Sequence, residues 1–294
     1  MNDEELNPYE QAEEEYEEPR LTILQCFGLI VLLIVLQLLT SLLLTKVDLR
    51  LFGETDWPNL AITHLVSGLL TAKAGAILAG ISLVAFFRPF RISVVNLVLV
   101  IVAVVGISIL SSELSNILQS IQPISESYQD LFNRLSQQNV IGVVLAIGII
   151  APITEELLFR GVILDGLRAK YPVKTAFFVS TALFAAVHIL PWLVLNAFVI
   201  GCFLAWLRIR TGSLGLCVLA HAIYNSLPFI LLRSVSVDIP GYTTGPTQTI
   251  QFQPVWFDLL GASLLAAGIA GIYFANKQTP PALADTATGA SHTS

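Results

Sequence analysis

The sequence predicts an all-α fold: a polytopic transmembrane helical bundle of about eight spans, with both termini in the cytosol. Composition is the first reason, because 55% of the 294 residues are hydrophobic and only 12% are charged, about half the charged share of a soluble globular domain. The second reason is that the apolar residues form eight runs, each close to the ~20 residues that cross the hydrocarbon core as a helix. The third is that basic residues lie mainly in alternate loops. Lipid is therefore the expected solvent for much of the surface.

Both ends of the chain are expected to be disordered tails. Residues 1–20 hold nine of the 21 acidic residues and few aliphatic ones, which is typical of a disordered segment, here on the cytosolic side. Residues 278–294 are rich in Thr, Ala and Pro. Without the acidic tail the chain is slightly basic overall, so a nucleic-acid partner has no electrostatic support.

The expected spans follow one another between the tails. They cover roughly residues 21–45, 60–87, 93–112, 139–165, 173–191, 193–209, 213–232 and 255–275. With eight spans, the loops on the side of the termini hold nine Lys and Arg residues and the other loops hold four. The positive-inside rule then places both termini in the cytosol.

The loop 113–138 is the longest between spans, and its interspersed leucines and isoleucines predict an amphipathic segment on the non-cytosolic surface. Together these features divide the chain into five parts. They are the tail 1–20, transmembrane helices with the amphipathic loop at 21–138, a transmembrane core at 139–232, a loop and last helix at 233–277, and the tail 278–294.

The core begins with a span that carries charges. Glu156 and Arg160 are four residues apart, so they share a helix face and are expected to pair. Glu155 points about 100° away from Glu156 and has a separate environment. Arg160 would keep Glu156 ionised, whereas Glu155 would be free to exchange protons. A charge at a helix centre costs roughly 2.5–3.5 kcal/mol on insertion scales, so these residues are candidates for function.

Pro152 precedes these acids by one helical turn. It is expected to free the carbonyl of Gly148 and to kink or widen the helix there. The alternative for this segment is a helix end at the membrane surface, with Glu and Arg merely solvated. The apolar residues on both sides of the motif argue against that alternative.

Two later spans carry further polar residues. Phe184 and His188 are four residues apart, as are His221 and Asn225. Taken alone, each pair is explained by a structural histidine or an interhelical hydrogen bond as well as by a functional site. Polar clusters on three spans within about 70 residues indicate instead one shared wet cavity, because each cluster must be shielded from lipid.

Two chemistries use such a set of residues. In the first, Glu155 is the general base for a water with help from His188, while His221 and Asn225 stabilise the oxyanion. In the second, Glu155, His188 and His221 bind Zn²⁺, which activates its bound water. The sequence has no HExxH motif, so spacing does not choose between them.

At these residues the chain resembles the type II CAAX prenyl endopeptidases, also called the CPBP or ABI family of bacteriocin-processing intramembrane proteases. The family pattern EExxxR matches Glu155 to Arg160, FxxxH matches Phe184 to His188, and HxxxN matches His221 to Asn225. The stretch Arg-Thr-Gly-Ser-Leu at 210–214 is common in bacterial members. The resemblance covers about residues 140–232, under a third of the chain.

The resemblance implies that 139–232 is a CPBP-like catalytic core. It implies an endopeptidase of the bacterial inner (cell) membrane that acts on a peptide or membrane protein, prenylated or not, with Zn as a candidate cofactor. It gives the catalytic roles to Glu155, His188, His221 and Asn225, and supporting roles to Glu156, Arg160 and Phe184.

Two other functions stay open at this point. A member of the same family without catalysis would act as a membrane scaffold or a bacteriocin-immunity factor. A proton-coupled transporter also uses Glu, Arg and His within spans. Lys73, a charged residue within the second expected span, is compatible with that hypothesis.

Overall fold

The computed structural model describes residues 21–47, 57–83, 93–234, 238–243 and 250–277. All the regular structure in these ranges is helical, which confirms the all-α expectation. The expected disordered tails, 1–20 and 278–294, lie outside the described residues. The helices are α1 (Ile23–Val47), α2 (Trp57–Ala79), α3 (Val94–Ile121), α4 (Glu126–Gln137), a continuous stretch made of α5 (Val140–Val143), η2 (Val144–Ile150), α6 (Ala151–Glu156), η3 (Leu157–Ile163) and α7 (Leu164–Arg168), then α8 (Val173–Ala186), α9 (Pro191–Thr211), α10 (Leu214–Ser234) and α11 (Val255–Ala275).

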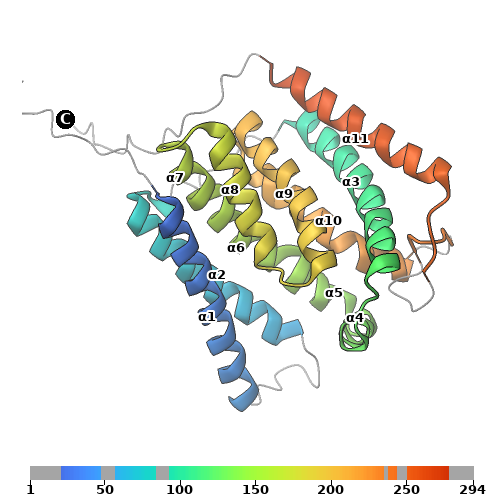
Figure 1. Cartoon of the computed structure of the whole chain (residues 1–294), viewed down its shortest axis with the longest axis horizontal. Coiled ribbons are helices and arrows are strands. Elements are labelled where there is room, and N and C mark those ends of the chain that lie inside the picture. The colour runs from blue at the N-terminus through green and yellow to red at the C-terminus, as the bar shows by residue number, and fades with distance from the viewer. Residues whose placement is uncertain (1–20, 48–56, 84–92, 235–237, 244–249, 278–294) are drawn as a thin grey trace, which may run out of the picture.

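Seven helical segments in the described chain are long and apolar enough to cross a membrane. The expected span 173–191 differs, because α8 has only 14 residues, about 21 Å at 1.5 Å per residue. The helix ends early because the chain turns at Val187–Leu190, where Ile189 has a φ of 60° and Pro191 starts α9. Helix α8 still runs beside α9 in the opposite direction, so the alternation of the chain through the bundle is kept (Figure 1).

The amphipathic segment expected within 113–138 is α4, which follows an α3 that extends to Ile121, well past the expected end at residue 112. Helix α4 lies at one end of the bundle (Figure 1). Leu135 within it and Ile124 just before it are buried, and Phe132 stacks on Phe229 of α10, so its apolar side packs on the bundle.

The helices form two pairs on either side of a central group. Helices α1 and α2 pack together on one side and α3 and α11 on the other, with the stretch Val140–Arg168 and helices α8 to α10 between them (Figure 1). The α3–α11 pair depends on small residues: a Cβ at Gly106 would lie 2.5 Å from the backbone nitrogen of Leu265. Such close approach is how membrane helices gain packing contacts without a hydrophobic driving force.

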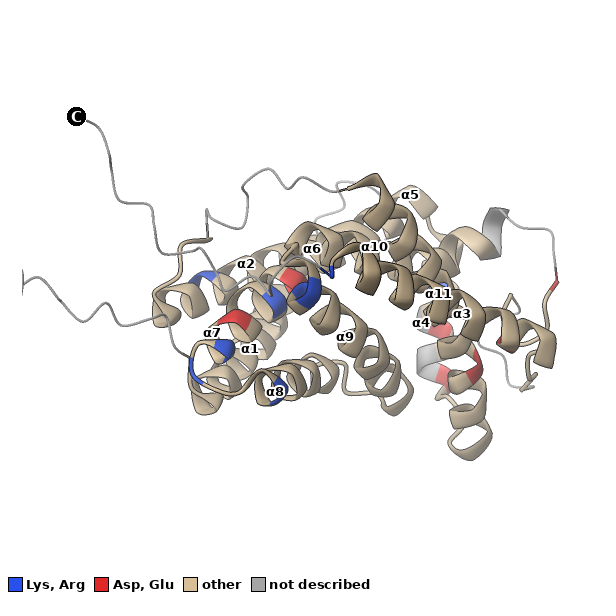
Figure 2. Ribbon diagram, turned by 90° about the horizontal axis from the view of Figure 1, so that it is seen from above, with Lys and Arg blue, Asp and Glu red and all other residues tan. Residues whose placement is uncertain are grey.

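Figure 2, which looks down on the bundle, shows Lys and Arg around α6, α7 and α8, with acidic residues among them at α6 and α7, and a further group of acidic residues at α3 and α4. Placement of the termini in the cytosol stays a prediction.

The central stretch is not a regular α-helix. Two π-helical segments, η2 and η3, flank α6, which carries the two glutamates. In η2 the N–H of Ala151 donates to the carbonyl of Ala146, five residues back. Pro152 has no N–H, so the next such bond, to Ile147, cannot form. The carbonyl of Ile147 is therefore left without that π-helical bond, whereas the freeing of the Gly148 carbonyl stays a prediction.

The middle of this stretch lies in the most buried part of the protein. The largest fully buried side chains include Arg160, Phe159 and Phe184. A guanidinium in such a place requires polar partners close by, and the partners of Arg160 define the site.

Candidate active site

Glu156 is the anchor of a buried ion cluster. Its Oε1 accepts from Nη1 of Arg160 at 2.8 Å and lies 2.8 Å from Nδ1 of His221. The second guanidinium nitrogen, Nη2, donates to the carbonyl of Gly201 in α9 at 3.1 Å. Neither Glu156 nor Arg160 is exposed at all. The pairing expected from the i,i+4 spacing is therefore present, and it extends to α10 through His221.

Phe184 of α8 packs against most of this cluster. The guanidinium carbon of Arg160 lies 4.2 Å from the ring centroid, a cation–π distance. The rings of His221 and His188 meet the Phe184 ring edge to face, with centroids 5.5 Å and 5.1 Å away. Phe184 thus holds two imidazoles and one guanidinium in fixed places with a single apolar side chain.

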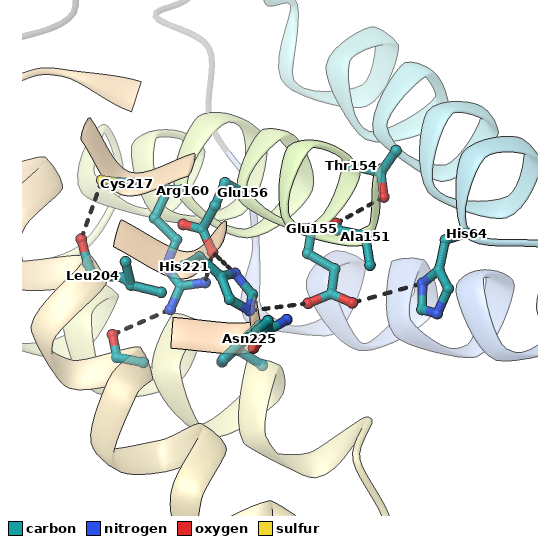
Figure 3. Close-up of polar contacts among 12 residues, drawn as sticks. His64, Ala151, Thr154, Glu155, Glu156, Arg160, Leu204, Cys217, His221 and Asn225 are labelled. Carbon is teal, nitrogen blue, oxygen red and sulfur yellow. Dashed lines mark hydrogen bonds and ion pairs between the residues drawn. The ribbon is translucent and has the colours of Figure 1, made fainter. Parts of the chain in front are cut away.

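Glu155 points to the other side of α6, away from Arg160, and lies between two imidazoles (Figure 3). Its Oε1 is 3.7 Å from Nδ1 of His64 in α2, and its Oε2 is 3.8 Å from Nε2 of His221. The side chain is 17% exposed, in contrast to the fully buried Glu156. The two adjacent carboxylates therefore have the separate environments that the sequence predicts.

His221 connects the two carboxylates. Its Nδ1 faces Glu156 and its Nε2 faces Glu155 (Figure 3). Because the Glu156 contact fixes the ring plane and places a proton on Nδ1, the orientation of Nε2 toward Glu155 is fixed as well.

Asn225 lies one helical turn after His221 and donates its side-chain N–H to the carbonyl of Ile147 at 3.1 Å. This is the carbonyl that Pro152 leaves without its helical bond. An amide nitrogen has two N–H groups, so one anchors Asn225 and the second is free to meet another acceptor. The close packing here depends on Gly148, where a Cβ would lie 2.2 Å from Oγ of Ser226.

His188 lies in the turn after α8 and does not touch Glu155. Its Nδ1 is 2.9 Å from the carbonyl of Phe184. It interacts electrostatically with Glu155, His221 and His64, yet the structure records no hydrogen bond or ion pair between the described residues His188 and Glu155. The structure therefore gathers Glu155, Glu156, Arg160, Phe184 and His221 in direct contact, and leaves His188 at the rim.

The donor arrangement does not fit a zinc ion. In the part of the chain that the structure describes, no three His, Cys, Asp or Glu side chains form a group that could hold a metal. Glu155, His188 and His221 are thus not brought together as a ligand set. No chemical step is derived through a metal, and Zn²⁺ stays a prediction to be tested by metal analysis.

Sequence reasoning missed His64. This residue lies within the second expected span, 60–87, and a histidine there carries the same signal as the flagged Lys73, namely a polar group inside an apolar run. The structure separates the two, because His64 faces Glu155 while Lys73 is exposed on α2. The spacing of residues within one helix does not tell how α2 lies along α6. The sequence alone therefore could not pair His64 with Glu155.

Comparison with known protein families gives a match over part of the chain. Residues 137–227 match the family model described as type II CAAX prenyl endopeptidase Rce1-like. No curated protein and no solved structure matches the chain. The match covers about a third of the chain and includes every motif from which the resemblance was inferred, so that resemblance is confirmed for this part of the chain.

Proposed function

From a membrane-embedded stretch that carries the Rce1-like type II CAAX prenyl endopeptidase match, we propose that the chain is an intramembrane endopeptidase with Glu155 as its general base. The observation that carries the proposal is the placement of Glu155 between two imidazoles, inside a helix that crosses the membrane. Arg160 is already paired with Glu156, so the carboxylate of Glu155 is not needed as its counter-ion. Glu155 is therefore available for proton transfer.

In the proposed reaction, Glu155 takes a proton from a water held between its carboxylate and the His221 ring. The resulting hydroxide attacks the carbonyl carbon of the scissile peptide bond. The oxyanion accepts from the second side-chain N–H of Asn225 and from Nε2–H of His221, whose ring in this proposal carries a proton on both nitrogens, with Nδ1–H bonded to Glu156. Glu155 then returns its proton to the leaving nitrogen as the C–N bond breaks, so the enzyme ends in its starting state.

The remaining residues support this reaction. Glu156 and Arg160 hold His221 by a chain of charged hydrogen bonds at 2.8 Å. Phe184 packs against Arg160 and His221. We assign His188, which is held at the rim by its contacts with Phe184, the role of assisting Glu155 without a direct bond.

The substrate is proposed as a peptide or a membrane protein, with or without a prenyl group, and the location as the bacterial inner membrane. A transporter is less well supported, because Lys73 lies outside the cluster of ionisable groups at the site. A scaffold or immunity factor without catalysis would use the same fold, and only activity separates it from a protease.

One experiment tests activity and identifies the substrate together. Mass spectrometry compares the termini of membrane proteins in cells that carry the wild-type chain and cells that carry Glu155→Gln. Asp165→Asn, which alters a different carboxylate in the same helical stretch, serves as the control. We expect peptide termini that are present with wild type and Asp165→Asn and absent with Glu155→Gln. Identical termini in all three would support the scaffold reading over the protease.

A further inference from the structure

Helix α1 carries a polar side chain that the proposed reaction does not use. Gln37 lies four residues after Leu33 and seven before Leu44, both of which are buried. Residues at these spacings share a helix face, so Gln37 belongs to the stripe of α1 that packs on the bundle. Its own side chain is half-buried.

Gln37 faces a small pocket beside the proposed base. The pocket lies between α1, α2 and α6 and is lined by Leu33, Gln37, His64, Gly68, Glu155 and Leu158, among others. At its floor α2 and α6 are in close contact, because a Cβ at Gly68 would lie 2.5 Å from Cβ of Thr154. Glu155 is therefore part of the wall of this pocket, next to the contact between the two helices.

The side-chain amide of Gln37 has no hydrogen-bond partner within the described chain. The two hydroxyl groups that line the same pocket, those of Ser67 and Thr154, both have one. Ser67 donates to the carbonyl of Thr63 at 2.5 Å, and Thr154 donates to the carbonyl of Ala151 at 3.0 Å. An amide with two donors and one acceptor in a spanning helix is costly without partners. Its orientation into a pocket indicates that the partner is a ligand.

We propose that Gln37 is a substrate-binding residue that holds the main chain of the peptide next to the scissile bond. This inference rests on the proposed function. A peptide group offers one N–H and one carbonyl, which match the acceptor and the donors of the glutamine amide. Leu33 and Leu158 supply apolar walls for an adjacent side chain, and no Lys or Arg lines the pocket.

The depth of Gln37 excludes a lipid ester as the usual partner. Ten residues separate Gln37 from Val47 at the nearer end of α1, about 15 Å along the helix. Lipid carbonyls lie at the membrane interface, whereas a peptide bound at Glu155 lies at the depth of Gln37. The ligand is therefore a peptide segment that enters the bundle.

The test uses Gln37→Leu, which keeps the volume of the side chain and removes its hydrogen-bonding groups. The control is Leu38→Ala, at an adjacent position that is 60% exposed. Each full-length variant is expressed in cells without the native chain, and the termini that depend on Glu155 are quantified by mass spectrometry. We expect at least a tenfold loss of these termini for Gln37→Leu and no loss for Leu38→Ala.

Purified protein in vesicles then gives the kinetics, with a peptide that spans the cleavage site found in those cells. We expect KM to rise about tenfold, equivalent to about 1.4 kcal/mol of binding, while kcat changes less than twofold. Thermal stability should be unchanged or higher, since leucine suits a spanning helix better than glutamine.

The outcomes separate the two proposals. Wild-type cleavage by Gln37→Leu, with cleavage lost in Glu155→Gln, overturns the subsite and leaves the proposed function standing. Termini that persist in Glu155→Gln overturn the proposed function, and the subsite with it. A loss of cleavage by Gln37→Leu that matches a loss of thermal stability makes Gln37 a structural residue and also overturns the subsite.

Discussion

The carboxylate of Glu156 lies 2.8 Å from Nδ1 of His221, a residue on another helix and 65 positions later in the chain. The same oxygen accepts from Arg160. One buried carboxylate thus fixes both a cation and the imidazole that faces the proposed base. Its removal should affect folding and catalysis together.

Glu156→Ala is expected to destabilise the protein by about 3–5 kcal/mol, because it leaves the buried guanidinium of Arg160 without its counter-ion. Cleavage should be lost in the same variant, since His221 loses the contact that orients it. Thermal unfolding in detergent and cleavage assays measure the two effects. Asp165→Asn, which breaks the ion pair with Arg208, is the matched control and should lose stability but keep activity. Full activity in Glu156→Ala would refute the positioning role.

Asn225→Ala removes a donor from a backbone carbonyl that the proline has already deprived of its helical bond. An unsatisfied buried acceptor costs about 1–3 kcal/mol, and the loss of one oxyanion donor costs about 10²–10³ in kcat. Asn225→Asp should lose as much activity, because a carboxylate cannot donate.

Asn196→Ala provides the comparison for Asn225. It removes an interhelical hydrogen bond of 2.6 Å to Ser115, away from the glutamates, and should leave kcat unchanged. Equal kcat values for Asn225→Ala and Asn196→Ala would show that Asn225 has no role in the reaction.

The local part of the site could be predicted from the sequence, and the long-range part could not. The Glu156–Arg160 pair follows from an i,i+4 spacing within one helix. The separate surroundings of Glu155 follow from the helical rotation between neighbours. His64 could not be placed, because its distance to Glu155 depends on the register of α2 against α6, which is set by the contact of Gly68 with Thr154.

The two differences in helix geometry have similar causes. The expected span 173–191 is shorter because hydropathy does not detect the turn at Ile189, whose backbone is left-handed. The carbonyl of Ile147 is left without its helical bond because η2 has a π-helical register, and hydrophobic periodicity over a single turn cannot distinguish π from α. Apolar composition alone predicts that a segment is buried in lipid but not where its helix ends.

His64→Ala is expected to lower kcat about tenfold with little change in KM, since the imidazole lies 3.7 Å from Glu155 and acts through that carboxylate. His64→Gln should restore part of the rate by keeping a polar group at the same position. Leu65→Ala, at an exposed position on the same helix, is the control. An unchanged kcat in His64→Ala would show that the contact between His64 and Glu155 has no role in the reaction.

His188→Ala is expected to abolish cleavage while the protein remains stable in detergent, because the proposed reaction uses this imidazole, which lies beside Phe184 at the rim of the site, to assist Glu155. The Phe184 ring keeps its contacts with Arg160 and His221 in this variant, so the ion cluster should persist. The measurement is cleavage together with thermal unfolding. Wild-type kcat would remove His188 from the catalytic set.

Metal removal separates the two proposed chemistries. Purified protein is treated with a chelator, its metal content is measured by mass spectrometry, and cleavage is followed before and after. The metal-free mechanism predicts activity within twofold at less than about 0.1 Zn per chain, because Glu155 alone activates the water. Loss of activity that returns with added Zn²⁺ would favour the zinc chemistry over the glutamate chemistry.

Gly68→Ala tests whether close contact between α2 and α6 sets the geometry at Glu155. The new Cβ would lie 2.5 Å from Cβ of Thr154, so α2 must shift, at a cost of about 1–3 kcal/mol. Because Thr154 precedes Glu155 and Gly68 lies one turn from His64, the same shift should separate His64 from the carboxylate and lower kcat. Gly28→Ala on α1, where a Cβ meets nothing within 4 Å, should leave both stability and kcat at wild-type levels. Adding Thr154→Gly to Gly68→Ala removes the clash and should recover part of the lost rate. If the double variant is no faster than Gly68→Ala alone, the loss of kcat does not come from the contact between Gly68 and Thr154.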